Sequence, residues 1–231
     1  MLLVYFISIG LLVGLIIAGT AYSRTVKIID KYSNKPCSLG WTGLELVSKC
    51  NSHFELGLSY SLTNKRLGDS YIPKKKVVIL NEETAKGTSI ASIAIASHEI
   101  GHAIQDKEKN FLLRLDMFLK RIYSIFKFLA MPIFIAGIVL LFIENMFNYG
   151  LILLACLVGI WLLSLITRLI TIPMELGASK IAYNMLKDNH ILTRAELKDA
   201  KKIMNAAGMT YVGALFINIL NLFKSIRRSF R

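Results

Sequence analysis

Three long apolar runs without a charged residue limit what this chain can fold into. They cover residues 1–23, 128–143 and 151–166, and each is close to the roughly 20 residues that a helix needs to cross a bilayer. Hydrophobic residues make up 54% of the 231 positions, which is well above an ordinary soluble domain. We therefore expect three transmembrane helices. The first run lacks the basic start of a secretory signal, so we interpret it as an uncleaved anchor.

The charges between these runs predict how the chain crosses the membrane. Lysine and arginine are frequent in residues 24–127 and again after residue 167, whereas the short segment 144–150 has neither. Because positively charged loops stay on the cytoplasmic side, we expect the N-terminus outside, a cytoplasmic region over 24–127, a transmembrane hairpin over 128–167 and a cytoplasmic helical region over 168–231. A short apolar stretch at 211–223 is predicted to lie on the membrane surface, with a fourth span as the alternative.

The net charge of +13 raises the question of nucleic-acid binding. The basic residues gather beside the apolar runs, as Arg24, Lys27 and Lys31 do after the first run, and this is the pattern of cytoplasmic membrane flanks. We therefore expect the lipid bilayer as a partner and no nucleic acid. The three cysteines match no zinc-ligand spacing and imply no disulfide framework, which fits a reducing compartment.

The region between the first two runs has the patterns of a small α+β fold. We predict a helix over 42–50, strands over 53–60 and 75–80, a loop over 82–87, and a helix from Ile90 to about Gln105 that is capped by Thr88 or Ser89. Near the C-terminus, the capping-box pattern from Thr193 to Glu196 predicts a helix that reaches about Ala207.

The helix that begins near Ile90 carries the sequence His98-Glu99-Ile100-Gly101-His102. Residues four apart lie on the same side of a helix, so His98 and His102 can bind one metal ion. Glu99 can reach a water on that metal and act as the general base. The motif predicts a Zn²⁺ site in a small α+β zincin-like catalytic region, within a mostly α-helical membrane protein.

A catalytic zinc takes three protein ligands, so one more residue is needed. The metzincin continuation would place a histidine at position 108, where this chain has Glu108. Glu175 follows the third apolar run, and a carboxylate at the membrane boundary requires a partner such as a metal. Because the second and third runs form a hairpin, the chain returns Glu175 to the side of His98. We predict Glu175 as the third ligand, and Glu108 is the second candidate.

These motifs resemble those of the YugP-like neutral zinc metallopeptidases, a family of bacterial membrane proteins, over almost the whole chain. The resemblance implies zinc, peptidase activity on protein or peptide substrates, Glu175 as third ligand, and a place in the bacterial plasma membrane. The segments that carry it are Lys31-Tyr32-Ser33, Thr42-Gly43-Leu44-Glu45, His98-Glu99-Ile100-Gly101-His102-Ala103-Ile104-Gln105, Pro173-Met174-Glu175, Ile191-Leu192-Thr193 and Asn205-Ala206-Ala207.

Two segments depart from the family pattern. The stretch Asp69-Ser70-Tyr71-Ile72-Pro73 stands where the family has D-H-Y-D-P, and Gly177 stands where E-F-D-A-S has an aspartate. A lost aspartate removes a partner that orients a zinc-bound histidine. Side chains that can take its place are Ser179, Asn205 and Asp106. Candidates to stabilise the oxyanion are His190, Tyr71, Tyr183 and Tyr211.

The predicted function is hydrolysis of peptide bonds by zinc-activated water, with the substrate added as a strand to residues 75–80. Heat-shock membrane proteases and CAAX-type prenyl proteases are enzymatic alternatives, because they also place spans between H-E-x-x-H and a later glutamate. An intramembrane protease is disfavoured, since Lys107 and Lys109 follow the metal helix closely. The non-enzymatic alternative is a membrane scaffold that retains a metal site.

Overall fold

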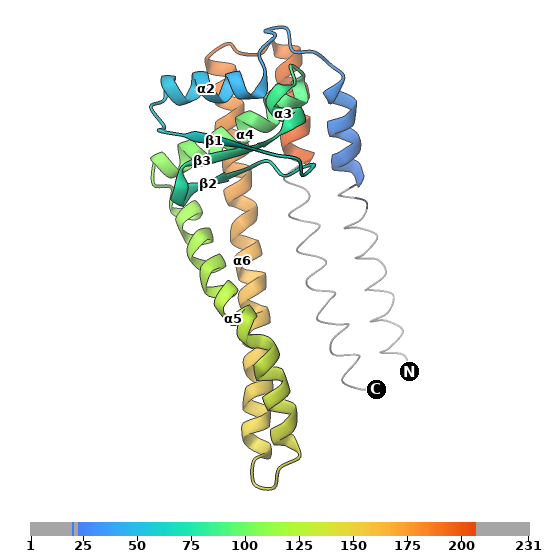
Figure 1. The fold of residues 1–231 in the computed structure, drawn as a ribbon, viewed down its shortest axis with the longest axis vertical. Helices are drawn as coiled ribbons and strands as arrows, with labels where there is room; N and C mark the ends of the chain where they lie inside the picture. Colours follow the sequence, from blue (N-terminus) through green and yellow to red (C-terminus); the bar gives the residue numbers. More distant parts are fainter. Residues whose placement is uncertain (1–19, 21–22, 207–231) are drawn as a thin grey trace.

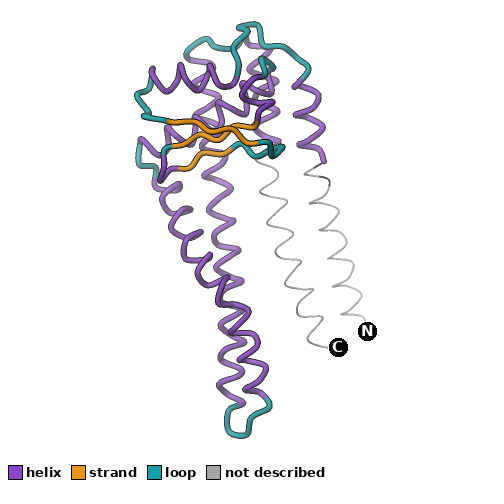
Figure 2. The backbone as a smooth tube through the Cα atoms, viewed as in Figure 1, coloured by secondary structure: helices purple, strands orange, loops and turns teal. Residues whose placement is uncertain are grey.

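The computed structural model describes residue 20 and residues 23–206. This part of the chain is mostly helical and contains one three-stranded sheet. The sheet and the shorter helices gather at one end of the molecule, and α5 and α6 extend from that end as a long pair (Figures 1 and 2). A mostly helical protein with a small α+β region, as predicted, is confirmed.

The sheet consists of β1 (Ser59–Thr63), β2 (Ser70–Ile72) and β3 (Val77–Asn81), in the order β1-β3-β2. β3 pairs in parallel with β1 and antiparallel with β2. β3 is therefore the central strand, with a neighbour on each side, and the prediction that a substrate adds to residues 75–80 is wrong. The edge strands of the described sheet are β1 and β2, and the sequence pattern did not reveal β2.

α2 (Gly43–His53) begins with a capping box, in which the Thr42 hydroxyl accepts a hydrogen bond from the Glu45 backbone N–H and the Glu45 carboxylate accepts one from the Thr42 backbone N–H. The helix continues to His53, so the first half of the strand expected over 53–60 is helix and turn. Gly57 has a φ of +65° in the turn that precedes β1, a conformation that glycine adopts without strain.

The loop expected over 82–87 is a short helix, α3 (Glu82–Lys86). Asn81 ends β3 and also caps this helix, because its side-chain oxygen accepts a hydrogen bond from the Glu83 backbone N–H at 2.9 Å. Two glutamates in the first turn add a favourable interaction with the helix dipole. A cap at the last residue of a strand leaves no room for a separate loop.

α4 (Ile90–Lys107) lies at the centre of the fold. Its N-cap is Ser89, one of the two residues predicted for this position. Small residues cover several of its faces, so neighbouring elements approach its backbone closely. A Cβ atom built at Gly101 would lie 2.4 Å from the backbone oxygen of Ala178 on α6, a separation that packed atoms do not adopt. Glycine at position 101 is therefore required for the contact between α4 and α6.

α5 (Phe111–Leu141) contains all but the last two residues of the second apolar run, and α6 (Phe147–Asp188) contains the third. Both are long and apolar enough to cross a membrane, and only 6% and 17% of their most apolar windows are buried. The exposed large apolar side chains of the two helices include Phe128, Met131, Ile135, Leu151, Ile152 and Ile166. The predicted anchor, residues 1–23, lies almost wholly outside the described residues, and the stretch 211–223 lies wholly outside them.

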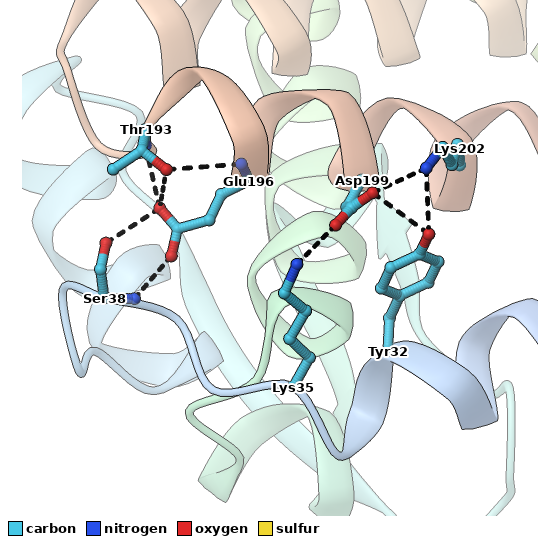
Figure 3. A network of polar contacts seen from close by, with 7 residues as sticks. All are labelled: Tyr32, Lys35, Ser38, Thr193, Glu196, Asp199 and Lys202. Atoms are coloured by element: carbon cyan, nitrogen blue, oxygen red, sulfur yellow. Dashed lines mark hydrogen bonds and ion pairs between the residues drawn. The ribbon is translucent and has the colours of Figure 1, made fainter.

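The helix over residues 194–206 begins with the predicted capping box. The Thr193 backbone N–H donates to the Glu196 carboxylate at 2.9 Å, and the Glu196 backbone N–H donates to the Thr193 hydroxyl at 3.4 Å. The same carboxylate accepts hydrogen bonds from the backbone N–H and hydroxyl of Ser38, at 2.7 and 2.9 Å (Figure 3). One glutamate thus caps its own helix and also holds residues 32–38, which we call the N-terminal segment, through Ser38.

Asp199, one turn further along this helix, makes a second link to the N-terminal segment (Figure 3). Its carboxylate pairs with Lys35 and Lys202, both at 2.8 Å, and accepts a hydrogen bond from the Tyr32 hydroxyl at 3.1 Å. The two lysines and the hydroxyl hold the pKa of Asp199 well below its usual value. Asp199 is thereby joined to Tyr32 and Lys35, which lie 167 and 164 positions earlier in the chain.

Candidate metal centre and active site

His98 and His102 lie on the same face of α4, one helical turn apart. Their ring centroids are 4.7 Å apart, with the rings nearly perpendicular. Each side chain is about nine-tenths buried, with exposed fractions of 12% and 11%. The predicted placement of two imidazoles side by side on a helix is found in the structure.

Glu175 reaches these histidines from α6. Its Oε2 atom lies 3.1 Å from His98 Nε2 and 3.3 Å from His102 Nε2. One ligand atom from each of the three residues lies within 4.8 Å of the other two, so the three could hold one metal ion. Glu108, the second candidate, is the residue that ends α4 as its C-cap and is not in this group.

Gln105 fixes the orientation of His102. Its Nε2 donates to the Met174 backbone oxygen at 3.0 Å, and this contact leaves its Oε1, an acceptor only, facing His102 Nδ1 at 3.1 Å. The proton of a neutral His102 ring therefore belongs on Nδ1. Its Nε2 then carries a lone pair, which points toward Glu175 and is the form that binds a metal.

Ser179 occupies the equivalent position beside His98. Its Oγ lies 3.1 Å from His98 Nδ1, so the hydroxyl can accept a hydrogen bond from a protonated Nδ1. The lone pair of His98 Nε2 would then be available to a metal. Of the three side chains proposed to replace the missing aspartate, Ser179 is the one that contacts a histidine here. Asp106 accepts a hydrogen bond from Tyr71 at 2.8 Å instead, and Asn205 lies exposed on the helix over 194–206.

The donor set fits Zn²⁺. With Nδ1 protonated on both rings, two nitrogen lone pairs and a carboxylate oxygen converge on one point, and a cation between them satisfies all three. Two imidazole nitrogens and one carboxylate are a ligand set that catalytic zinc sites use. The Nδ1 atoms of His98 and His102 are hydrogen-bonded to Ser179 and Gln105, respectively. Imidazoles that bind a metal through one nitrogen generally have such a partner on the other.

The pKa values of His102 and Glu175 depend on the charges of the groups around them. Burial lowers the pKa of His102, but the hydrogen bond to Glu175 and the charges of Glu99 and Glu175 outweigh it, so the pKa is raised. Burial acts to raise the pKa of Glu175, yet its contacts with His102 and His98 hold that pKa well below the usual range. The Glu175 carboxylate is thus anionic at neutral pH.

Glu99 is buried beside the same histidines, with 7% of its surface exposed. Burial, together with the negative charges of Glu175 and Asp69, raises its pKa, while His98 and His102 act in the opposite direction. A carboxyl group with a raised pKa is suited to accept a proton and then release it.

The oxyanion candidates, and the histidine at position 53 for which no role is predicted, lie elsewhere or already have partners. His53 ends α2 and packs its ring edge against Phe54. Tyr183 and His190 line a separate cavity of about 580 Å³, and Tyr211 lies outside the described residues. Gln105 was not among the predicted site residues, although its position three residues after His102 already places the two side chains on the same face of the helix.

Two histidines one turn apart, a glutamate between them and a carboxylate from a second helix define the class of H-E-x-x-H metal centres. A match to the family described as "Putative neutral zinc metallopeptidase" spans residues 6–229, so the chain belongs to this family. The resemblance noted in the motifs is confirmed.

The chain is also similar to a curated relative, the protein named "Putative membrane protease YugP" from Bacillus subtilis (strain 168). The two sequences are 30% identical over an alignment of 202 positions, and this alignment covers 85% of this chain and 84% of that protein. No solved structure matches the chain.

Proposed function

We propose that this protein is a membrane-bound zinc metallopeptidase that cleaves peptide bonds. The observation that carries the proposal is the convergence of His98 Nε2, His102 Nε2 and Glu175 Oε2 at one point beside the buried carboxyl of Glu99. Family membership supports the choice of zinc as the metal and of a protein or peptide as the substrate.

In this proposal each residue has a distinct role. His98, His102 and Glu175 hold the Zn²⁺, and Gln105 and Ser179 keep the imidazoles in the metal-binding tautomer. The bound ion supplies Lewis-acid polarisation of the scissile carbonyl and lowers the pKa of a water molecule. Glu99 takes the proton from the attacking water and delivers it to the leaving amine.

The hairpin of α5 and α6 is proposed to cross the plasma membrane, with the catalytic region facing the cytoplasm. Its large apolar side chains are exposed rather than buried, which suits contact with lipid. Basic residues stand at the end of the hairpin nearer the catalytic region, whereas the turn between the helices has none. The relative's printed name, a membrane protease, agrees with this placement. Residues 1–23 are proposed as an additional anchor.

Proteolysis by the detergent-purified Glu99→Gln variant tests the function. Glu99 is proposed as the base and not as a ligand, so its replacement should abolish cleavage of a denatured general substrate and leave the zinc content unchanged. Glu83→Gln, which removes an exposed acid from α3, is the matched control and should cleave like the wild type.

The possible outcomes separate the proposal from its competitors. Equal cleavage by the wild type and Glu99→Gln would assign the activity to another mechanism or a contaminant. Zinc bound in both proteins, with no cleavage of any substrate in a peptide library, would favour the membrane scaffold that retains a metal site.

A further inference from the structure

Asp116 is a buried carboxylate in a helix whose other residues are mostly exposed or half-buried. Of the residues of α5, only Leu113, Asp116 and Gly137 are buried, and Asp116 is 2% exposed. Aspartate is almost never buried so completely unless it is paired, because a charge loses its hydration in the protein interior. Asp116 does not belong to the candidate metal centre, so its burial requires another explanation.

Two partners satisfy this carboxylate. Asp116 Oδ2 pairs with Lys120 Nζ at 2.7 Å, one turn further along α5. Asp116 Oδ1 accepts a hydrogen bond from the hydroxyl of Thr171, which lies on α6 and is also buried. The same hydroxyl lies 2.9 Å from the Thr167 backbone oxygen, so its proton lies between an acceptor in its own helix and one in α5. The contact from Asp116 to Thr171 is therefore a polar link between the two helices.

The apolar part of the pairing between α5 and α6 gives the two helices little directional information. Both helices are strongly apolar, and apolar contacts are non-directional, so a helix can slide or turn against its neighbour and still keep them. A hydrogen bond, in contrast, requires a short distance and a favourable angle. A buried polar contact can therefore select one register of a helix pair, which is the best-attested use of such groups.

The register of α6 decides where Glu175 lies. Thr171 and Glu175 are four residues apart and so lie on the same face of the helix. The buried residues of α6 continue from Ser164, Thr167 and Thr171 to Glu175 and Ala178. A change of register by one residue turns a helix by about 100° and shifts it by about 1.5 Å. Glu175 would then leave the two histidines, whose Nε2 atoms lie 3.1 and 3.3 Å from its carboxylate.

The link from Asp116 to Thr171 closes a ring of three helices around the candidate metal centre. Three residues separate the end of α4 from the start of α5, and α6 crosses α4 (Figure 1). α5 is linked to α6 through Asp116 and Thr171, and α6 meets α4 through Glu175. Pro173 lies between Thr171 and Glu175. Because proline removes one backbone hydrogen bond from a helix, α6 depends on contacts with its neighbours at this point.

We propose that Asp116 and Thr171 are positioning residues, whose hydrogen bond fixes the register of α6 on α5 and thereby holds Glu175 at the metal centre. The inference rests on the proposed function, in which Glu175 is the third ligand. Without the hydrogen bond, only a fraction of the molecules would have the register that brings Glu175 to the histidines. The apparent zinc affinity would fall by that fraction.

Zinc affinity of the full-length, detergent-purified protein, measured by competition with a chelator, tests the proposal. Thr171→Val removes the hydroxyl, keeps the shape of the side chain and should weaken zinc binding about ten-fold, the low end for a hydrogen bond to a charged group. Thr171→Ser keeps the hydroxyl and should bind like the wild type. Thr167→Val is the matched control, because the Thr167 hydroxyl is equally buried but donates to the Leu163 backbone oxygen of its own helix.

The visible absorption of the Co²⁺-loaded proteins is a second readout, because it depends on the number and geometry of the ligands. A loss of stability alone would leave this spectrum unchanged, whereas displacement of Glu175 would alter it. We expect an altered spectrum in Thr171→Val and the wild-type spectrum in Thr171→Ser and Thr167→Val. Thermal melts of the metal-free proteins check that each variant folds.

Three results would overturn the proposal. Thr171→Val could match the wild type in zinc affinity and Co²⁺ spectrum. Thr167→Val could lose as much affinity as Thr171→Val, which would indicate a general effect of valine in α6. Thr171→Ser could fail to preserve the affinity, which would assign the effect to side-chain shape. Zinc retained in Glu175→Gln would contradict the proposed ligand set itself, whereas zinc lost there with no effect of Thr171→Val would contradict the register argument alone.

Discussion

His98 and Glu175 are 77 positions apart, yet His98 Nε2 lies 3.1 Å from Glu175 Oε2. All of α5 and the first part of α6 lie between them in the chain. The candidate metal centre thus depends on how the hairpin folds back on α4, because α4 alone supplies only two of the three proposed ligands. Changes in the contact between α4 and α6 should therefore weaken metal binding even where the proposed ligands are left intact.

Replacement of Glu175 by glutamine should abolish stoichiometric zinc binding. The neutral amide removes the carboxylate that would bind and partly neutralise a zinc ion held by the two imidazoles. We expect a loss of zinc affinity greater than the roughly 10–100-fold that follows loss of an outer partner. Zinc content measured by mass spectrometry after dialysis checks this expectation. Glu108→Gln is the control and should retain zinc; loss of zinc in this variant instead would identify Glu108 as the ligand.

Gln105→Met should lower zinc affinity or peptidase activity by about 10–100-fold while the protein still folds. Methionine has a similar volume, but it cannot replace the hydrogen bond that Gln105 accepts from His102 Nδ1 or the one that it donates to the Met174 backbone oxygen. A competition titration with a zinc chelator gives the affinity, and a thermal melt in the presence of excess zinc checks the fold. Affinity equal to that of the wild type would show that the tautomer of His102 does not depend on this residue.

The helix that carries His98 and His102 could be predicted because its signal is local. The H-E-x-x-H spacing places both histidines on one face whatever surrounds the helix, and Ser89 and Thr193 cap helices with contacts no more than three residues away. Glu175 was predicted less directly, from the cost of a carboxylate at the membrane boundary and from the return of the hairpin.

The errors lie where tertiary contacts decide the structure. Residues 75–80 have the pattern of a strand, but only the pairing with both β1 and β2 shows that β3 is central and not an edge. The short strand Ser70–Ile72 has too few residues for a periodic pattern. The role of Ser179 depends on the approach of α6 to His98 across 81 positions, which no local pattern in the sequence specifies.

Gly101→Ala should destabilise the protein by about 1–3 kcal/mol, the usual cost of forcing an extra carbon into a packed contact. The added Cβ would meet the Ala178 backbone oxygen at 2.4 Å, so α4 and α6 must move apart and Glu175 must move away from the histidines. A lower melting temperature together with weaker zinc binding is expected. Gly159→Ala is the matched control, because no atom lies within 4 Å of its Cβ position. Equal behaviour of the two variants would contradict the close-contact argument.

Asp199→Asn should lower the melting temperature at neutral pH by a few degrees, and this difference should shrink in acid. The pKa of Asp199 is held below its usual value by Lys202, Lys35 and Tyr32 in the folded protein, whereas the unfolded chain has the ordinary value of about 3.9. A depressed pKa stabilises the folded state above the unfolded pKa, and the effect is lost as the pH falls through the folded pKa.

Melting curves of the wild type and Asp199→Asn from pH 7 down to about pH 3 measure this difference. The gap between the two proteins should stay constant down to about pH 5 and narrow below about pH 4. Asp30→Asn is the control, because Asp30 pairs with Arg66 but its side chain is 51% exposed, and exposed ion pairs contribute little. A gap that does not change with pH, or an equal gap in Asp30→Asn, would mean that the carboxylate of Asp199 does not hold the N-terminal segment against the helix over 194–206.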